Sequence, residues 1–440
     1  MDINVAKLDK GLKGEIIIPA DKSISHRAIM FSSIAKGKTI IKNFLYASDC
    51  RSTVSVFQNL GVDIKFIDNN TVEIDSSGKL KPPSTILDCG NSGTTIRLVS
   101  GILSGQNFDS TLTGDTSLSK RPMKRIIEPL SLMGADITSQ EFRAPLKIKG
   151  KHLNSIEYKS PIASAQVKSS ILLAGIQAEG TTVVEEPYLS RNHTELMLKY
   201  LGADIEAYGN IIKTKKSDLF AKDIIVPGDI SSAAFFIVAA SIIPDSNIII
   251  KNVGLNPTRT GIIDIVIRMG GNIEILDRKN ISGEDVGDIK IKYSSLKGCN
   301  INGSDIPRLI DELPIIALMA TQADGETKIT NAGDLRNKEA DRITALVTEF
   351  RKLGIDIDEL PDGFVINGKQ QIKGNSELNV YHDHRLAMTF YVAGLLAKQP
   401  TVIKEFQWVD ISLPEFLPLM ESLINSWYYV AIKFNYQEFN

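Results

Sequence analysis

Gly61-Val62-Asp63-Ile64 is the first copy of the stretch that decides the fold. Four further copies follow: Gly134-Ala135-Asp136-Ile137, Gly202-Ala203-Asp204-Ile205, Gly270-Gly271-Asn272-Ile273 and Gly354-Ile355-Asp356-Ile357. An apolar Leu or Met precedes the glycine of every copy. A glycine directly after a helix takes the left-handed conformation that ends it, and the Ile then opens a strand. The copies lie roughly 70 to 85 residues apart, so each marks a whole repeated α/β unit rather than one turn of a solenoid.

The first half of each unit repeats as well. A helix that leads into a short β-type run is predicted six times, at residues 23–35, 94–103, 164–178, 231–243, 309–323 and 385–397. Each unit therefore reads as helix, turn, strand, loop, helix, turn and strands. The fold class is α/β, and six units indicate two domains of three repeats.

Two similar segments indicate where the chain passes between these domains. Ile16-Ile17-Ile18-Pro19-Ala20-Asp21 and Ile224-Ile225-Val226-Pro227-Gly228-Asp229 each place a Pro between a strand and a Ser-rich helix start. Ordinary helix-entry chemistry explains each segment equally well on its own. The pairing favours a hinge, which predicts a discontinuous domain of residues 1–19 plus 228–440 and an inserted domain of residues 20–227.

Composition narrows the class of protein. The 440 residues are 43% hydrophobic and 23% charged with a net charge of −2, which is ordinary for a soluble globular protein and gives no reason to expect nucleic-acid binding. No apolar run approaches the roughly 20 residues that span a bilayer, and the N-terminus lacks a signal-peptide core. Three scattered cysteines exclude a disulfide scaffold and a Cys-based zinc site. We expect a cytoplasmic protein, most simply a monomer.

Polar and basic clusters occupy the starts of the predicted helices or the loops after them. In the first half they are Asp21-Lys22-Ser23-Ile24-Ser25-His26-Arg27, Asp88-Cys89-Gly90-Asn91-Ser92-Gly93-Thr94-Thr95-Ile96-Arg97, residues 119–125, residues 164–170 and residues 190–195. Free N–H groups at helix starts attract anions. Capping, tight turns and solvated faces explain each cluster taken singly. Their common position favours a binding site for anions.

The second half adds carboxylates and further cations. Asp311 interrupts the apolar run 306–319, as either a helix cap or a buried general base. Residues 335–342 and 382–388 follow, and His382-Asp383-His384 has no recurrent metal-site spacing, so no metal is predicted. Together the clusters predict that helix starts from both domains serve a polyanionic pair of substrates, with Asp311 and Glu339 for proton transfer.

These motifs, in this order, give the chain a close resemblance to a known family. It resembles the 5-enolpyruvylshikimate-3-phosphate synthases, within the enolpyruvyl transferases, from about Val5 to Leu423. The motifs are Asp21–Arg27, Gly90-Asn91-Ser92-Gly93-Thr94, Arg121-Pro122-Met123, Ser164-Ala165-Gln166-Val167-Lys168-Ser169, Asp311-Glu312-Leu313-Pro314, Leu335–Arg342 and Asp383-His384-Arg385-Leu386-Ala387-Met388. The resemblance implies two domains, each of three βαβαββ repeats around buried parallel helices.

The resemblance also implies a reaction and the residues that carry it out. The reaction moves the enolpyruvyl group of phosphoenolpyruvate to shikimate-3-phosphate, in the shikimate pathway to aromatic amino acids, with no cofactor and with glyphosate as an inhibitor. The implied catalytic residues are Lys22, Asp311, Glu339 and His384. The implied shikimate-3-phosphate contacts are Lys22, Ser23, Arg27, Ser164, Ala165, Gln166, Ser190, Asp311 and Lys338. The implied phosphoenolpyruvate contacts are Lys22, Asn91, Gly93, Arg121, Gln166, Arg342 and Arg385.

The sequence departs from the family pattern at three places, and three other classes of protein are alternatives. Ala165 replaces a Ser of many relatives, Ile411 stands where some have a Lys, and the aromatic tail after Leu423 matches nothing. UDP-N-acetylglucosamine enolpyruvyl transferase normally has Lys-Asn at the first motif and a reactive loop Cys, both missing here. A non-catalytic phosphometabolite-binding protein would not need Asp311 and Glu339 together. An RNA 3′-phosphate cyclase would need a basic stripe.

Overall fold

The computed structural model describes residues 1–425. The aromatic tail that the sequence left open continues beyond them, outside the described residues. The chain forms two compact units, each with its own hydrophobic core. We call the unit of Met1–Pro19, Gly228–Lys279 and the described residues from Asp285 onward the terminal unit. The inserted unit comprises Ala20–Pro227 and Asn280–Glu284.

Three long helices form the interior of the inserted unit, and further helices lie outside them. The helices are α1 (Lys22–Ile34), α2 (Ser48–Asn59), α3 (Gly93–Ser104), α4 (Thr116–Lys120), α5 (Lys124–Leu132), α6 (Ala165–Gly175) and α7 (His193–Tyr200). α3 packs against both α1 and α6. Most residues of these three helices are buried, and α1 and α6 bury polar side chains such as Arg27 and Lys168 together with the apolar ones.

Three sheets of one design enclose these helices. The strands are β3 (Ala35–Lys42), β4 (Asp63–Phe66), β5 (Val72–Ser77), β6 (Leu87–Asp88), β7 (Asp109–Thr113), β8 (Asp136–Gln140), β9 (Arg143–Lys149), β10 (Glu157–Lys159), β11 (Thr181–Glu185), β12 (Ile205–Tyr208), β13 (Ile211–Lys215), β14 (Leu219–Phe220) and β15 (Ile224–Ile225). Their orders are β14-β3-β5-β4 with β15 beside β3, β6-β7-β9-β8, and β10-β11-β13-β12. In each sheet a parallel pair is extended by an antiparallel hairpin.

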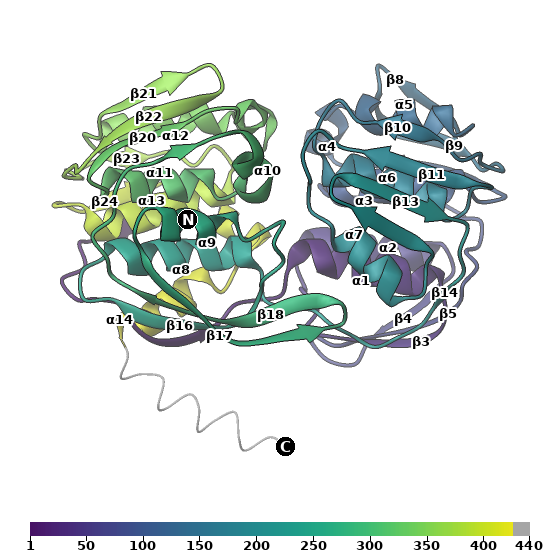
Figure 1. Ribbon diagram of the computed structural model, residues 1–440, viewed down its shortest axis with the longest axis horizontal. Helices are drawn as coiled ribbons and strands as arrows, with labels where there is room; N and C mark the ends of the chain where they lie inside the picture. Colours follow the sequence, from purple (N-terminus) through teal and green to yellow (C-terminus); the bar gives the residue numbers. More distant parts are fainter. Residues whose placement is uncertain (426–440) are drawn as a thin grey trace. The chain divides into compact units, whose positions relative to one another are not determined.

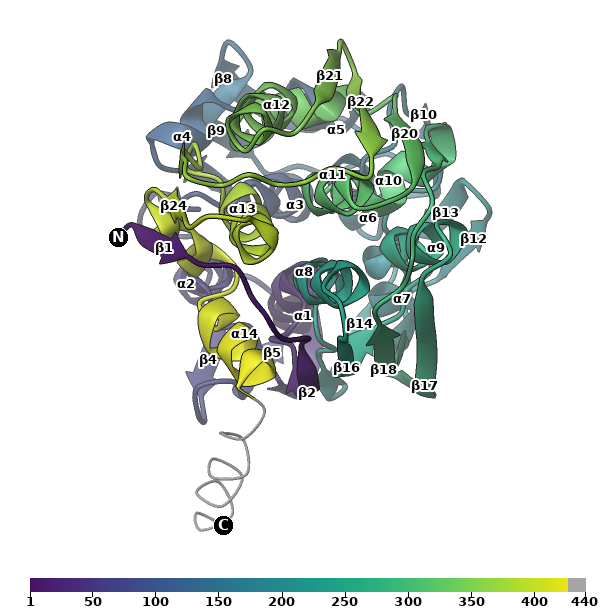
Figure 2. The same cartoon turned by 90° about the vertical axis from the view of Figure 1, so that its left-hand side faces the viewer.

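The terminal unit repeats the plan (Figure 1). Its helices are α8 (Ile230–Ile242), α9 (Gly261–Arg268), α10 (Ile306–Leu309), α11 (Leu313–Thr321), α12 (Arg342–Lys352), α13 (His384–Leu396) and α14 (Phe416–Ile424). Its strands are β1 (Ile3–Val5), β2 (Lys13–Ile17), β16 (Asn247–Gly254), β17 (Asn272–Ile281), β18 (Glu284–Lys292), β19 (Asn300–Ile301), β20 (Gly325–Ile329), β21 (Ile357–Leu360), β22 (Gly363–Gly368), β23 (Glu377–Leu378) and β24 (Thr401–Ile403). α8, α11 and α13 pack on one another, and Figure 2 shows α8 and α13 nearly end-on among the strands.

The repeated Gly-x-Asp-Ile stretch does what the sequence predicts. All five glycines have positive φ, between +77° and +100°: Gly61, Gly134, Gly202, Gly270 and Gly354. Each directly follows the C-cap residue of a helix, and a strand begins two or three residues later. The predicted fold class, two domains of three repeats around buried helices, is confirmed.

The sixth repeat differs because no hairpin follows its second helix within residues 1–425. β24 pairs with β23 on one side and with the N-terminal strand β1 on the other. The chain then continues into α14. This explains why the Gly-x-Asp-Ile stretch occurs five times although six helix starts were predicted.

One sequence prediction about local structure was wrong. A single helix was predicted over residues 309–323, with Asp311 inside it. The structure instead has α10 and α11 separated by Ile310, Asp311 and Glu312. Pro314 is the cause, because proline has no N–H for the carbonyl four residues earlier and its ring clashes with that carbonyl. Asp311 therefore lies in a turn between two helices, with its side chain 14% exposed.

Candidate active site

The inserted unit carries one group of the predicted residues, which we call the inserted-unit cluster. It comprises Lys22, Ser23, Arg27, Asn91, Gly93, Arg121, Ser164, Ala165, Gln166 and Ser190. Most lie at or just before the first turn of α1, α3 and α6. Asp21 caps α1 by accepting a hydrogen bond from Ile24 N, and Ser92 caps α3 in the same way from Thr95 N. Helix starts offer free N–H groups and a positive dipole end to anions.

Arg27 is buried and forms no direct ion pair with a described residue, although the carboxylates of Glu195 and Asp21 attract it from further away. Its guanidinium donates to Thr194 Oγ1 at 2.7 Å, to Ser169 Oγ at 2.9 Å and to the Ser23 carbonyl at 2.9 Å, all neutral acceptors. Its side chain forms no ion pair with a carboxylate of residues 1–425. Burial lowers the pKa of Arg27 to about 10. A buried cation with only neutral partners is suited to an anionic ligand.

Arg97 has the same character, and the sequence analysis did not select it. Its Nη1 donates to Gln166 Oε1 at 2.7 Å, and Gln166 Nε2 donates to Thr94 Oγ1 at 3.1 Å. Burial, followed by repulsion from Arg121 and Arg125, lowers the pKa of Arg97 to about 10. The usable signal was its spacing, since a residue four after Gly93 lies on the same helix face. Arg97 thus connects two predicted contacts, Gly93 and Gln166.

Arg121 is held against the loop before α3. Its Nη2 donates to Asn91 Oδ1 at 2.7 Å, and Asn91 Nδ2 donates to Asp115 Oδ2 at 2.7 Å. A Cβ at Gly93 would lie 2.8 Å from Arg97 Nη1 and 3.4 Å from Arg121 Nη1. The absence of a side chain at Gly93 therefore allows two guanidinium groups to approach the start of α3.

Ser164 and Ser190 are brought together by a buried carboxylate that the sequence analysis missed. Glu186 accepts hydrogen bonds from the Ser164 backbone N–H at 3.1 Å and from the Ser190 hydroxyl. Lys168 Nζ lies 2.8 Å from both Glu186 Oε2 and Glu195 Oε1, and all three side chains are at most 5% exposed.

Lys22 is more accessible, with its Nζ 3.4 Å from Asp49 Oδ2.

The remaining predicted residues form the terminal-unit cluster: Asp311, Lys338, Glu339, Arg342, His384 and Arg385. Three cations surround Asp311. Lys338 Nζ and Arg342 Nη1 lie 3.2 Å and 3.5 Å from its Oδ1, and Arg385 Nη2 lies 3.9 Å from its Oδ2. His384 begins α13 and is 3% exposed.

Arg342 is the centre of this cluster. Its Nε donates to Asp383 Oδ2 at 2.6 Å and its Nη2 to Glu339 Oε2 at 2.7 Å. Burial alone would lower the pKa of Arg342, but attraction by Asp383, Glu339 and Asp311 raises it above its usual value. Asp383, another residue not selected from the sequence, also accepts from the Arg385 and Leu386 backbone N–H groups at the start of α13.

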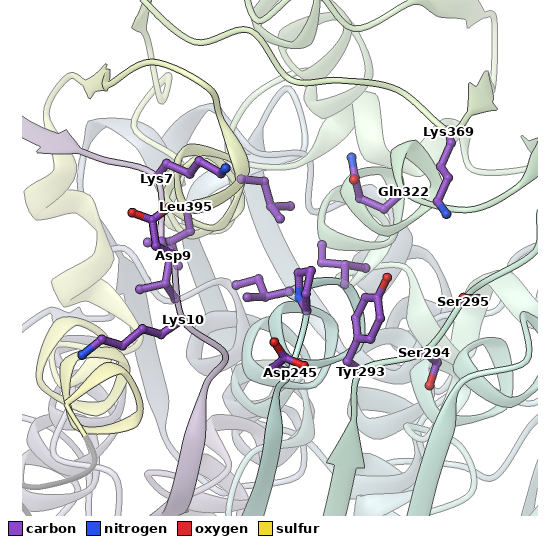
Figure 3. Close-up of a pocket in the computed structure, with 15 residues that line it drawn as sticks. Lys7, Asp9, Lys10, Asp245, Tyr293, Ser294, Ser295, Gln322, Lys369 and Leu395 are labelled. Carbon is purple, nitrogen blue, oxygen red and sulfur yellow. The ribbon is translucent and has the colours of Figure 1, made fainter.

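The terminal unit also has a cavity of about 330 Å³ (Figure 3), and none of the predicted site residues lines it. Ile242, Gln322 and Leu395 line it at the C-terminal ends of α8, α11 and α13, together with Lys7 and Lys369. Asp311 lies just before α11, and His384 and Arg385 begin α13, so these predicted residues lie at the opposite ends of two of the helices.

No described helix has both the length and the apolar character needed to cross a membrane. Among residues 1–425, no group of three His, Cys, Asp or Glu side chains is placed to hold a metal ion.

Comparison with known proteins identifies the family. The family model for EPSP synthase (3-phosphoshikimate 1-carboxyvinyltransferase) matches residues 7–420. The chain is 52% identical to the 3-phosphoshikimate 1-carboxyvinyltransferase of Thermoanaerobacter sp. (strain X514), over 96% of this chain and 100% of that protein. The enzyme of the same name from Thermodesulfovibrio yellowstonii is 51% identical, over 95% and 99% of the two chains. The structure of EPSP synthase from Acinetobacter baumannii superposes with a TM-score of 0.88 at 43% identity, covering 96% of this chain and 98% of that one. The resemblance seen in the sequence is therefore confirmed, and the chain belongs to the EPSP synthase family.

Proposed function

We propose that this chain transfers the enolpyruvyl group of phosphoenolpyruvate to the 5-hydroxyl of shikimate-3-phosphate and releases phosphate. As a transferase of this family it acts in the shikimate pathway to aromatic amino acids. The residue assignments rest on one observation, the different arrangement of buried charges in the two units. The inserted unit presents buried arginines that form no ion pair with any described residue, and the terminal unit presents Asp311 among three cations.

The inserted-unit cluster recognises the phosphate groups. Lys22, Ser23 and Arg27 at the start of α1, with Ser164, Ala165, Gln166 and Ser190, bind shikimate-3-phosphate. Asn91, Gly93 and Arg121 bind the phosphate of phosphoenolpyruvate, with Lys22 and Gln166 contacting both ligands. We add Arg97, whose bond to Gln166 brings a further cation to this group. Charge-assisted hydrogen bonds to oxyanions are the strong ones, so these contacts supply much of the binding energy.

The terminal-unit cluster handles the carboxylate and the protons. Arg342 and Arg385 bind the carboxylate of phosphoenolpyruvate, and Lys338 and Asp311 contact the shikimate ring. Asp311 accepts the proton of the 5-hydroxyl as its oxygen attacks C2. C3 gains a proton at the same time and loses one as phosphate leaves. Glu339 lies beside the methylene, and Lys22 and His384 complete the acid–base set.

The reaction needs no redox step and no electron sink. The positive groups stabilise charge that develops on the reacting oxygens, and acid–base groups move the protons. We therefore infer an enzyme without an organic cofactor or resident metal. Scattered cysteines and ordinary composition support a cytoplasmic monomer.

Phosphate release from phosphoenolpyruvate tests this function. Release should require shikimate-3-phosphate and should not occur with UDP-N-acetylglucosamine in its place. Release with the nucleotide sugar would indicate the sister transferase. Binding of both ligands without any release would indicate a phosphometabolite-binding protein.

A further inference from the structure

Four buried polar side chains form a continuous chain of hydrogen bonds in the inserted unit. His26 Nδ1 on α1 lies 2.6 Å from Thr53 Oγ1 on α2, which lies 2.7 Å from Thr95 Oγ1 on α3. Thr95 Oγ1 lies 2.7 Å from Ser92 Oγ, at the N-cap of the same helix. All four residues are at most 1% exposed. The chain of hydrogen bonds thus runs from the interior of the unit to Ser92, directly before Gly93 at the start of α3.

Counting the available protons shows which group donates and which accepts in each of these hydrogen bonds. Thr95 uses its only hydroxyl proton to donate to Ser92. Thr53 must therefore donate to Thr95, which leaves Thr53 only its lone pairs for His26. His26 consequently donates from Nδ1–H. Burial lowers the pKa of His26 to about 4, so the imidazole is neutral at neutral pH and this tautomer persists.

The end of the chain is a hydroxyl that can only donate. Ser92 Oγ accepts from the Thr95 hydroxyl and, at 3.1 Å, from the Thr95 backbone N–H, which occupies both lone pairs. Its own proton has no acceptor within the part of the chain that the structure describes. A buried donor without an acceptor is costly, so a bound group that supplies the acceptor is favoured.

The surroundings identify that acceptor as an anion. Ser92 lies between Asn91, which binds Arg121, and Gly93, at the start of a twelve-residue helix. Arg97, with no carboxylate partner among residues 1–425, lies one turn further along α3. The N-terminal end of α3 and the guanidinium groups of Arg97 and Arg121 all favour negative charge beside Ser92.

We propose that the Ser92 hydroxyl donates a hydrogen bond to the phosphate group of phosphoenolpyruvate, and that His26, through Thr53 and Thr95, forces it to do so. Ser92 is then a specificity-determining residue and His26 a positioning residue. The proposal rests on the proposed function, because it refines the phosphate contact of the same site. Both lone pairs of the Ser92 hydroxyl are occupied, so it cannot accept a hydrogen bond from a ligand. It therefore discriminates against a ligand that is protonated at this position.

The first test is Ser92→Gly, which removes the hydroxyl while keeping a residue type tolerated at an N-cap. We expect KM for phosphoenolpyruvate to rise about 10- to 100-fold, as for loss of a hydrogen bond to a charged group, with KM for shikimate-3-phosphate unchanged. Ser92→Thr keeps the hydroxyl and should stay near wild type. Ser104→Ala removes a buried hydroxyl at the other end of α3, where it donates to the Ser100 carbonyl, and should change neither KM.

The second test is a double-mutant cycle between His26→Leu and Ser92→Gly. His26→Leu should raise KM for phosphoenolpyruvate alone but add little in the Ser92→Gly background, because its effect passes through that hydroxyl. If His26→Leu does not fold, as judged by circular dichroism, Thr53→Val interrupts the same chain and replaces it.

The inference is overturned if Ser92→Gly changes KM for phosphoenolpyruvate by less than about twofold, or raises both KM values equally as a general structural defect would. Additive effects in the cycle would remove His26 from the proposal. In each of these cases the wild-type enzyme still releases phosphate. A wild-type protein that releases none would refute the proposed function instead.

Discussion

Both clusters bury arginine side chains, but among the described residues only in the terminal-unit cluster does a buried arginine form ion pairs with carboxylates. In the terminal-unit cluster, Arg342 lies against the carboxylates of Asp383, Glu339 and Asp311. In the inserted-unit cluster, Arg27 and Arg97 have only hydroxyl, amide and carbonyl partners. The pKa values follow the same division: burial lowers those of Arg27 and Arg97 to about 10, while that of Arg342 is raised by its carboxylates.

This difference indicates what each cluster does without its ligands. Burying a charge is costly unless the protein or a ligand compensates it. The terminal-unit cluster is compensated internally, so its ion pairs hold Asp311 and Glu339 in a fixed arrangement, which the proposed proton transfer requires. In the inserted-unit cluster Arg27 and Arg97 form no ion pair within the described part of the chain, and under the proposed function phosphate groups supply the opposite charge. The variants below test this division.

The largest effect is expected at Asp311. Asp311→Asn keeps the size of the side chain and removes its basicity, so turnover should fall by about 10²- to 10⁴-fold with substrate binding retained. Steady-state kinetics and calorimetry measure the two quantities. Asp358→Asn, at an exposed carboxylate of the same unit, is the matched control. Turnover within a few-fold of wild type would exclude Asp311 as the base.

Arg342→Gln should show that the terminal-unit cluster is held together by its own charges. The change leaves Asp383, with a side chain 0% exposed, without its closest cation. The free energy of unfolding should fall by about 3 to 5 kcal/mol, as when one partner of a buried ion pair is removed. Urea unfolding measures it, and Arg351→Gln, exposed on the same helix, should cost less than about 1 kcal/mol. An unchanged midpoint would contradict internal compensation.

Arg97→Gln is the corresponding change in the inserted unit, and the opposite pattern is expected. Stability without ligands should not fall, because the variant loses a buried charge that no carboxylate compensates. KM for phosphoenolpyruvate should rise about 10- to 100-fold, since a charge-assisted contact is lost. A loss of stability as large as that of Arg342→Gln, with unchanged KM, would show that the two clusters do not differ in this way.

The smallest effect on catalysis is expected for Gly93→Ala. Its Cβ would come within 2.8 Å of Arg97 Nη1, and that flexible side chain can move aside. KM for phosphoenolpyruvate should rise by less than about tenfold, and the inhibition constant for glyphosate by a larger factor. Inhibition kinetics on both proteins measure the ratio. A wild-type enzyme that millimolar-order glyphosate does not inhibit would contradict the expectation.

Several features of the fold could be read from local chemistry. The five glycines with positive φ end helices wherever they occur, because no other residue adopts that conformation as easily. The helix caps at Asp21, Ser92 and Asp383 were also visible as Asp or Ser before an apolar run. The helix break at Asp311 was missed because hydrophobic periodicity outweighed the local effect of Pro314.

Fewer features of the candidate site could be predicted from local sequence patterns. Arg97 and Asp383 lie inside motifs quoted from the sequence, and the spacing of Arg97 from Gly93 and the cap position of Asp383 are local signals, but neither signal indicates that the charge is buried. Glu186 lies in no motif, and only packing brings it to Ser164 and Ser190. The His26–Thr53–Thr95 contacts join residues up to 42 positions apart.

The sequence by itself determined the repeat, the helix ends and the residue types gathered at helix starts, because capping, turns and periodicity act over a few neighbouring residues. Only the tertiary structure decided which buried charges are compensated and in which direction the hydrogen bonds run. Both depend on which side chains from different repeats come within a few ångströms of one another. Electrostatic and hydrogen-bond energies change steeply over that range, and no local pattern records it.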